Sequence, residues 1–279
     1  MKKHNLRLFI ILSFFFISRF YIFQNPPPFY SDVNHDYRRY AVMWTEGYTP
    51  YLKHFYEYPP TTIPLIYIPQ MLQISGIGDF YQNFRILTFG LDFLVFLMII
   101  KAIKYLKTSK LQKNLSLAFY LITPMIAKDF FYEGIDLVFI SSLVIGIIYY
   151  LFKTKKTWLN RFWFWFFFWL STSIKFMSVP LLAVYLYLTK LNLKKELKAI
   201  SLAFLAVWGI PLAIFRSSLA VMFVFHGRRG LKYASFPSFV VETINYWTNT
   251  EIRLNKAPDF ELQGPISAIA EKVVSIVFP

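Results

Sequence analysis

Apolar residues gather in repeated blocks along the chain, separated by shorter polar segments. The blocks fall at 8–23, 84–103, 115–127, 135–152, 162–174, 176–189 and 199–215, and a last one begins near 266. Several are shorter than the ~20 residues of a full transmembrane helix. We therefore expect an all-α, polytopic bundle of about seven or eight spans, in which the short blocks are tilted, broken or enclosed by other helices.

The first block opens the chain as MKKHNLRLFIILSFFFISRFYIF. A basic start followed by an apolar run is typical of a signal peptide. No small-residue cleavage site follows, however, and Arg19 with bulky aromatic residues closes the run. We interpret this segment as an uncleaved first span.

Two of the polar connections, 24–83 and 216–265, are long. Loops of this length without strong structure of their own tend to be functional. Within the first, DYRRYAVMWTEG predicts a short helix that ends at Gly47. The segment EYPPTTIPLIYIPQMLQ predicts a helix lying along the membrane surface, with its tyrosines at the level of the headgroups.

The distribution of charge predicts on which side of the membrane each loop lies. The chain has 30 Lys and Arg against 15 Asp and Glu, which alone could indicate nucleic-acid binding. The cations are instead spread over alternate short connections, near 2–7, 101–113, 153–161 and 190–198. The positive-inside rule makes these connections cytoplasmic, places the N-terminus in the cytoplasm and removes the argument for a nucleic-acid partner.

Acidic residues show the opposite distribution. Glu196 is the acid found among the expected cytoplasmic connections, whereas both long connections and the turn near 129–136 are acidic. The positive-inside rule constrains acids little, so this segregation is independent information. The expected outer side therefore holds the segments that could carry chemistry.

Three acids of the first long connection are candidates. Asp32 and Asp36, in SDVNHDYRRYA, are four residues apart and share a face if the segment is helical. The alternative is a solvated loop in which Arg38 and Arg39 pair with them. Glu57, in EYPP, lies among aromatic residues that would partly desolvate it; the alternative is an interfacial aromatic belt.

Later segments add one more acid and three cations. Asp136, in KDFFYEGIDLVF, begins an apolar helix, where an acid also simply stabilises the helix N-terminus. Lys175 lies inside the apolar stretch 162–189, at a cost of about 2.5–3.5 kcal/mol, so it is a functional candidate or a snorkelling lysine. Arg228 and Arg229, between glycines, suit phosphate oxygens or lipid headgroups.

Two charges within the apolar blocks have plainer interpretations. Asp92 follows Arg85 by seven residues, two turns along one helix face, so the two are expected to pair. Arg19 lies near the outer end of its span and can snorkel. The four histidines show no metal-ligand spacing, and the chain has no cysteine.

Taken in order, the outer segments resemble the motifs of membrane-embedded glycosyltransferases of the C type (GT-C), and of the bacterial branch that uses polyprenyl-phosphate mannose. That family has an Asp in the first outer loop, then Y-x-x-Y-A, G-x-x-P-Y and E-Y-P-P, matched here by Asp32 and by residues 37–41, 47–51 and 57–60. Its G-x-D, I-K-x-x-x-x-P and R-G…A-S motifs are matched by residues 134–136, 174–180 and 229–235. The resemblance covers roughly residues 30–235.

The resemblance implies a plasma-membrane enzyme that moves mannose or another hexose from a polyprenyl-phosphate donor to a glycan, lipid or protein acceptor on the extracytoplasmic face. Asp32 is expected to be the general base, with Asp36 as its rival because the gap to the paired tyrosines is longer than in the family. Glu57 and Asp136 are expected to shape the site and orient the acceptor.

Lys175, helped by Arg228 or Arg229, is expected to bind the donor phosphate. No cofactor is expected, although a pair of carboxylates could hold a divalent metal ion together with substrate phosphate.

GT-C enzymes are usually longer, and this sequence ends within an expected span, so we interpret 1–279 as one transmembrane domain that is incomplete at its C-terminus. Two other classes compete with the enzyme. A transporter or lipid flippase would use Lys175 and Asp136 as a gate, but the matching halves common in such proteins are not seen. A truncated, non-catalytic membrane partner is the second.

Overall fold

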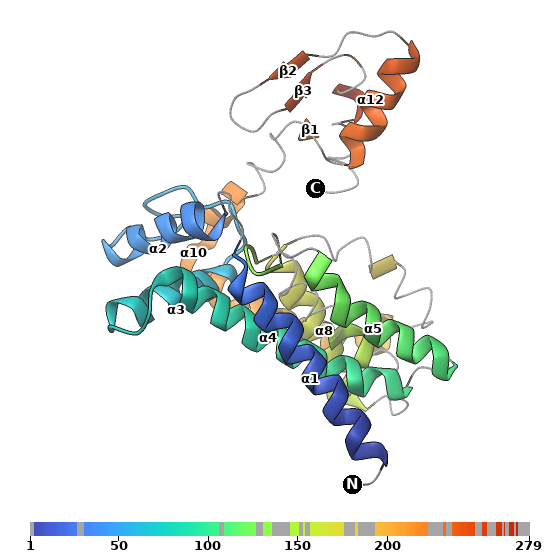
Figure 1. Cartoon of the computed structure of the whole chain (residues 1–279). Helices are drawn as coiled ribbons and strands as arrows, with labels where there is room; N and C mark the ends of the chain where they lie inside the picture. The colour runs from blue at the N-terminus through green and yellow to red at the C-terminus, as the bar shows by residue number, and fades with distance from the viewer. Residues whose placement is uncertain are drawn as a thin grey trace.

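The computed structural model describes residues 3–26, 31–105, 109–126, 131–135, 146–150, 153, 157–175, 182–183, 193–222, 231–232, 236–248, 253–255, 261–263, 265, 268–270 and 272. This part of the chain is mainly helical, as the sequence predicts. In Figure 1 the helices α1, α4, α5 and α8 run alongside one another, and α12 lies apart from them with three short strands.

Helix α1 (Lys3–Gln24) is formed by the first apolar block. Phe9, Ile17 and Phe20 are 62%, 66% and 64% exposed, whereas Phe15 and Ile22 are fully buried against the other helices. A helix surface of large exposed apolar side chains is unfavourable in water and favours contact with lipid or with another apolar surface.

The other long helices pack in two groups, one of which includes α1. Helices α4 (Phe80–Tyr105) and α5 (Lys110–Ile126) share an apolar cluster with α1, in which Phe15 stacks on Phe96 with 4.4 Å between ring centroids. Helix α8 (Trp158–Thr172) packs against α10 (Leu193–Phe215), and a 3-10 turn, η3 (Arg216–Leu219), follows α10.

Two of the described helices have the length and apolar composition to cross a membrane. They are α4 and the helical segment Glu196–Met222, while the apolar part of α1, Phe9–Gln24, is shorter. Membrane association therefore has support from the structure, but a bundle of seven or eight spans is not shown. The expected blocks 135–152 and 176–189 lie largely outside the described residues.

The helix ends fall into two groups. At one end, here called the loop end, Tyr37 meets Ile135 and Thr61 meets Ser173. The opposite end, here called the basic end, carries cations of α4, α5, α8 and α10 at Lys101, Lys104, Lys110, Lys113, Arg161, Lys194 and Lys198. Its acid, Glu196, is buried and lies 3.3 Å from a guanidinium nitrogen of Arg161.

The segment between α1 and α4 forms most of the loop end. A π-helical turn, η1 (Val33–Tyr37), continues into α2 (Arg38–Thr45), and Gly47 follows with a φ of +88°, which suits glycine. The short helix predicted to end at Gly47 is confirmed. Helix α3 (Thr62–Ile74) is also confirmed as a helix, and the exposed side chains of Ile68, Met71 and Ile74 leave it an apolar outer face.

The connection 216–265 differs from the sequence expectation. It contains helix α12 (Phe236–Thr248) and antiparallel strands β1 (Leu231–Lys232), β2 (Arg253–Asn255) and β3 (Glu261–Gln263), with β3 in the middle of the sheet. The helical prediction is thus correct for the bundle, but a small sheet is added. Strands of two or three residues are too short to show an alternating pattern in the sequence.

Candidate functional site

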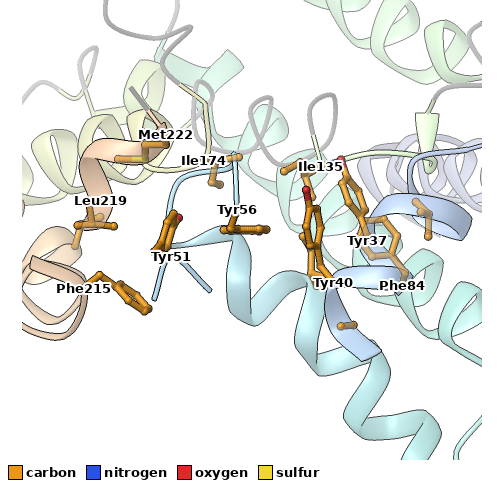
Figure 2. Packing of buried hydrophobic residues seen from close by; sticks show 14 of the residues in the cluster. Tyr37, Tyr40, Tyr51, Tyr56, Phe84, Ile135, Ile174, Phe215, Leu219 and Met222 are labelled. Carbon is orange, nitrogen blue, oxygen red and sulfur yellow. The ribbon is translucent and has the colours of Figure 1, made fainter. Parts of the chain in front are cut away.

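One buried aromatic cluster joins the segments that meet at the loop end (Figure 2). Tyr37, Tyr40, Tyr51 and Tyr56 come from the segment between α1 and α4, and all four are less than a tenth exposed. Against them pack the buried side chains of other segments, namely Ile135, Ile174, Phe215, Leu219 and Met222. Four of the segments expected on the outer side, 30–41, 47–60, 128–139 and 171–180, thus contribute described residues to one cluster, whereas 225–235 lies largely outside the described residues.

The first two acids lie at the turn that opens this cluster. The backbone carbonyl of Asp32 accepts from the N–H groups of Asp36 and Tyr37, both at 2.9 Å, which puts the two carboxylates one turn apart. The side chain of Asp32 is exposed, whereas Asp36 is half-buried. Asp36 lies 3.5 Å from the guanidinium of Arg39 and 3.1 Å from Nδ1 of His35.

Glu57 lies between Tyr56 and Tyr58, two residues of this aromatic cluster, and is half-buried, as the sequence predicts. Burial is the largest cause of the raised pKa values of Tyr40 and Tyr58, and the negative charge of Glu57 raises both further. Asp36 acts in the same direction on Tyr40, and Asp32 on Tyr58. Three carboxylates are thus within electrostatic reach of two phenols that stay protonated at neutral pH.

The residues after Glu57 connect the aromatic cluster to the end of α8. The Thr61 hydroxyl donates to the backbone carbonyl of Ser173 and lies 2.8 Å from the Ser173 hydroxyl. Thr62 next to it bonds to the Tyr56 hydroxyl at 2.6 Å. Two segments that lie 112 residues apart in the sequence are therefore side by side.

Lys175 lies at this junction. Its backbone N–H donates to the carbonyl of Ser171 at 3.1 Å, so it ends the last turn after α8, and its side chain is half-buried. Ile174 before it is buried in the aromatic cluster, close to Tyr56 in Figure 2. The structure thus places Lys175 at the loop end, in the same region as Glu57.

Three predicted site residues, Asp136, Arg228 and Arg229, lie outside the described residues. The residue before Asp136 is described: the backbone N–H of Ile135 donates to the Tyr37 hydroxyl at 3.4 Å. The start of the G-x-D segment therefore contacts the carboxylate-bearing turn.

Backbone geometry indicates a residue that sequence reasoning missed. Tyr51 and Arg216 have φ values of +63° and +48°, a region that residues other than glycine rarely occupy. Strained backbone of this kind gathers at functional sites. The ring of Tyr51 packs 4.9 Å from that of Phe215, so Arg216, an exposed cation, borders the same cluster. No sequence signal marks a positive φ at an arginine.

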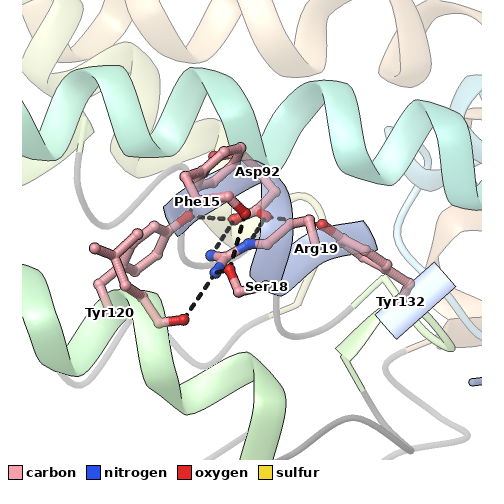
Figure 3. Close-up of polar contacts among 7 residues, drawn as sticks. Phe15, Ser18, Arg19, Asp92, Tyr120 and Tyr132 are labelled. Atoms are coloured by element: carbon pink, nitrogen blue, oxygen red, sulfur yellow. Dashed lines mark hydrogen bonds and ion pairs between the residues drawn. The ribbon is translucent and has the colours of Figure 1, made fainter. Parts of the chain in front are cut away.

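The buried charges of the bundle pair differently from the sequence prediction (Figure 3). Arg19 does not snorkel: it is fully buried, and its Nε donates to Asp92 at 2.8 Å. The Asp92 carboxylate also accepts from the hydroxyls of Tyr120 and, at 2.8 Å, Tyr132. The prediction that Asp92 pairs with Arg85 is wrong, because the packing of α1 against α4 brings Arg19 closer.

Arg85 forms a second buried group one layer nearer the loop end. Its Nη2 donates to the carbonyl of Ile22 at 2.8 Å, and its Nε lies 3.4 Å from the carboxylate of Glu133. Glu133 also accepts from the Tyr81 hydroxyl at 2.6 Å. Arg85 therefore balances Glu133 instead of Asp92.

Within the part of the chain that the structure describes, three or more histidine, aspartate or glutamate side chains do not come together as a metal site. Tyr40 and Trp44 lie near His54, whose Nε2 accepts from the Trp44 indole N–H at 2.8 Å, so this histidine has a structural partner. The described polar chemistry of the loop end comprises carboxylates, neutral phenols and cations, among them Lys175, Arg39 and Arg216.

Comparison of the sequence with protein-family models finds no match, and the same holds for the curated protein sequences and for the solved structures. The argument for function therefore rests on the residues and their geometry.

Proposed function

We propose that the chain is an integral membrane glycosyltransferase that moves a hexose, mannose or a close relative, from a polyprenyl-phosphate donor to an acceptor hydroxyl on the extracytoplasmic face. The observation that carries the proposal is the junction of Thr61 and Ser173. It brings the segment of Glu57 and the turn of Lys175 together beside the turn of Asp32 and Asp36.

The reaction needs a base, a cationic phosphate site and a positioned acceptor. The acceptor oxygen attacks the anomeric carbon of the sugar while Asp32 takes the hydroxyl proton. The bond from that carbon to the phosphate oxygen breaks, and polyprenyl phosphate leaves with the electron pair. Lys175 stabilises the negative charge that grows on this phosphate.

The structure favours Asp32 over Asp36 as the base. Asp32 is the more exposed of the two, so an acceptor can approach it more closely than it can approach Asp36. Glu57 can accept hydrogen bonds from sugar hydroxyl groups, and the neutral tyrosine hydroxyls of the aromatic cluster can donate to them or accept from them. Asp136 is proposed to orient the acceptor, and Arg228 or Arg229 to assist Lys175, on the motif match alone.

Sidedness and multiple spans are part of the proposal. The supporting observations are the lysines and arginines that recur in alternate short connections and the acids that gather in the other connections. Topology reporters fused after Lys110, Lys155 and Lys195 should all read cytoplasmic. A single extracytoplasmic reading among them would contradict the topology.

The function is tested by sugar transfer. The purified full-length protein in lipid nanodiscs is incubated with radiolabelled polyprenyl-phosphate mannose or glucose and a panel of glycan, lipid and peptide acceptors. We expect labelled product from the parent and almost none from Asp32→Asn. Donor binding without turnover of any donor would contradict an enzyme, and movement of donor between vesicle leaflets without transfer would support a flippase instead.

A further inference from the structure

The Asp92 carboxylate is the centre of a buried network that joins three elements. It is 1% exposed and accepts from Arg19 of α1, from Tyr120 of α5 and from Tyr132 of the turn at 131–135. Arg19 makes further bonds to the Ser18 hydroxyl at 3.0 Å and to a backbone carbonyl of α5 at 3.1 Å. The link from Tyr132 is therefore additional to the contacts that hold the helices together.

The next residue of the turn is anchored as well. Glu133 accepts from Tyr81 of α4 at 2.6 Å and lies 3.4 Å from Arg85 of the same helix. Arg85 in turn donates to the carbonyl of Ile22, at the end of α1. Two consecutive residues of the turn are thus fixed to buried charges of one helix, and both charges are tied to α1.

The turn leads directly into the candidate site. Ile135 is fully buried, and its N–H donates to Tyr37, which follows the turn of Asp32 and Asp36. We propose that Tyr132 and Asp92 are positioning residues, which hold the 131–135 turn against Tyr37 and so fix the turn of Asp32 and Asp36 where the acceptor binds. This inference rests on the proposed function, since it assigns a role within the same site.

Two matched variants separate positioning from plain stabilisation. Tyr132→Phe and Tyr120→Phe each remove one phenolic hydroxyl that donates to Asp92. Tyr132 belongs to the turn, whereas Tyr120 belongs to α5. A loss of helix packing around Asp92 would affect both variants alike. A displaced 131–135 turn is expected only in Tyr132→Phe, because only Tyr132 belongs to that turn.

The first measurement does not depend on activity. The chain has no cysteine, so Ile135→Cys introduces a single thiol at a buried position of the turn. In that background, the rate of maleimide labelling reports how often the turn opens. We expect Tyr132→Phe to label about tenfold faster, because a hydrogen bond to a charged group is lost, and Tyr120→Phe to label at the rate of its parent.

The second measurement is kinetic. In full-length protein without the introduced thiol, Tyr132→Phe should raise the KM for the acceptor about tenfold and leave the KM for the donor unchanged. Tyr120→Phe should leave both at the parent values. Equal effects of the two variants, or no effect of Tyr132→Phe on labelling, would overturn the proposal.

The two proposals fail in different ways. If the parent transfers no sugar, the proposed function falls, while the labelling rates still decide whether Tyr132 holds the turn. If transfer occurs but Tyr120→Phe and Tyr132→Phe change the acceptor KM equally, the proposed enzyme activity stands and the positioning role of Tyr132 is lost.

Discussion

Two acidic residues of the molecule, Asp92 and Asp32, lie in opposite environments. Asp92, inside the bundle, is 1% exposed and has Arg19, Tyr120 and Tyr132 as donors. Asp32, at the loop end, has an exposed side chain, and it makes no side-chain cap on the turn that it begins. The first acid is surrounded by protein, whereas the second can be reached from outside.

The contrast separates a carboxylate that holds structure from one that can do chemistry. A buried charge is tolerated when it is paired and its remaining hydrogen-bonding positions are filled, which leaves no room for a substrate. A base must instead approach within about 2.6–3.2 Å of the hydroxyl that it deprotonates. The depth of an acid in an apolar chain is therefore a poor guide to catalysis unless its partners are known.

The largest effect is expected where a buried pair is broken. Arg19→Leu leaves the Asp92 charge buried without its cation, which should lower the free energy of unfolding by about 3–5 kcal/mol. That is a large share of the 5–15 kcal/mol of a typical protein. Thermal unfolding of the purified protein measures it.

The matched control is Arg19→Leu combined with Asp92→Leu, which removes both charges together. Because no unpaired charge is left, this double variant should be more stable than Arg19→Leu alone. A single variant as stable as the parent would show that the Asp92 environment is not desolvated.

The second effect is catalytic. Asp32→Asn should lower the rate of sugar transfer by about 10²–10⁴, since the base is lost. Stability should change by less than about 0.5 kcal/mol, because the side chain is exposed and does not cap the helical turn that it begins. Transfer kinetics and unfolding of the same preparation give the two numbers, and a loss of stability without a loss of rate would reverse the comparison drawn above.

The third effect concerns Lys175, a half-buried cation whose exposure lies between that of Asp92 and that of Asp32. Lys175→Met should weaken binding of the polyprenyl-phosphate donor about 10–100-fold, the equivalent of a lost hydrogen bond to a charged group. Donor binding to protein in nanodiscs is the measurement. Lys53→Met is the control, since Lys53 is an exposed cation of the same end that bonds to the carbonyl of Gly47; equal losses in both would indicate unspecific attraction.

Much of the fold follows from local pattern. The apolar blocks predict α1, α4 and α5, and Gly47 predicts the end of α2, because each depends on residues adjacent in sequence. The grouping of acids predicts the end of the bundle at which Glu57 lies. The strands β1 to β3 could not be predicted, since they contain only two or three residues each.

The pairing of buried charges could not be read from spacing. Arg85 and Asp92 lie on one face of α4, which makes them plausible partners within the helix. Which arginine reaches Asp92 is decided by how α1 packs against α4, and that is a tertiary relation. The positive φ of Arg216 is likewise not readable from the sequence, because nothing in the neighbouring residues marks it.

The smallest effect is expected one turn along from the base. Asp36 is paired with Arg39 at 3.5 Å, and the two side chains are 28% and 55% exposed, so solvent screens the pair. Surface pairs of this kind contribute about 0–1 kcal/mol, so Asp36→Asn should leave the unfolding midpoint and the transfer rate close to those of the parent. Side-by-side kinetics of Asp32→Asn and Asp36→Asn make the comparison. If Asp36→Asn loses the rate and Asp32→Asn keeps it, the base is the half-buried acid held by Arg39, and exposure is not what selects the catalytic carboxylate. If both variants transfer sugar at the parent rate, the opening turn is a solvated loop and the chemistry must depend on Glu57 or Asp136.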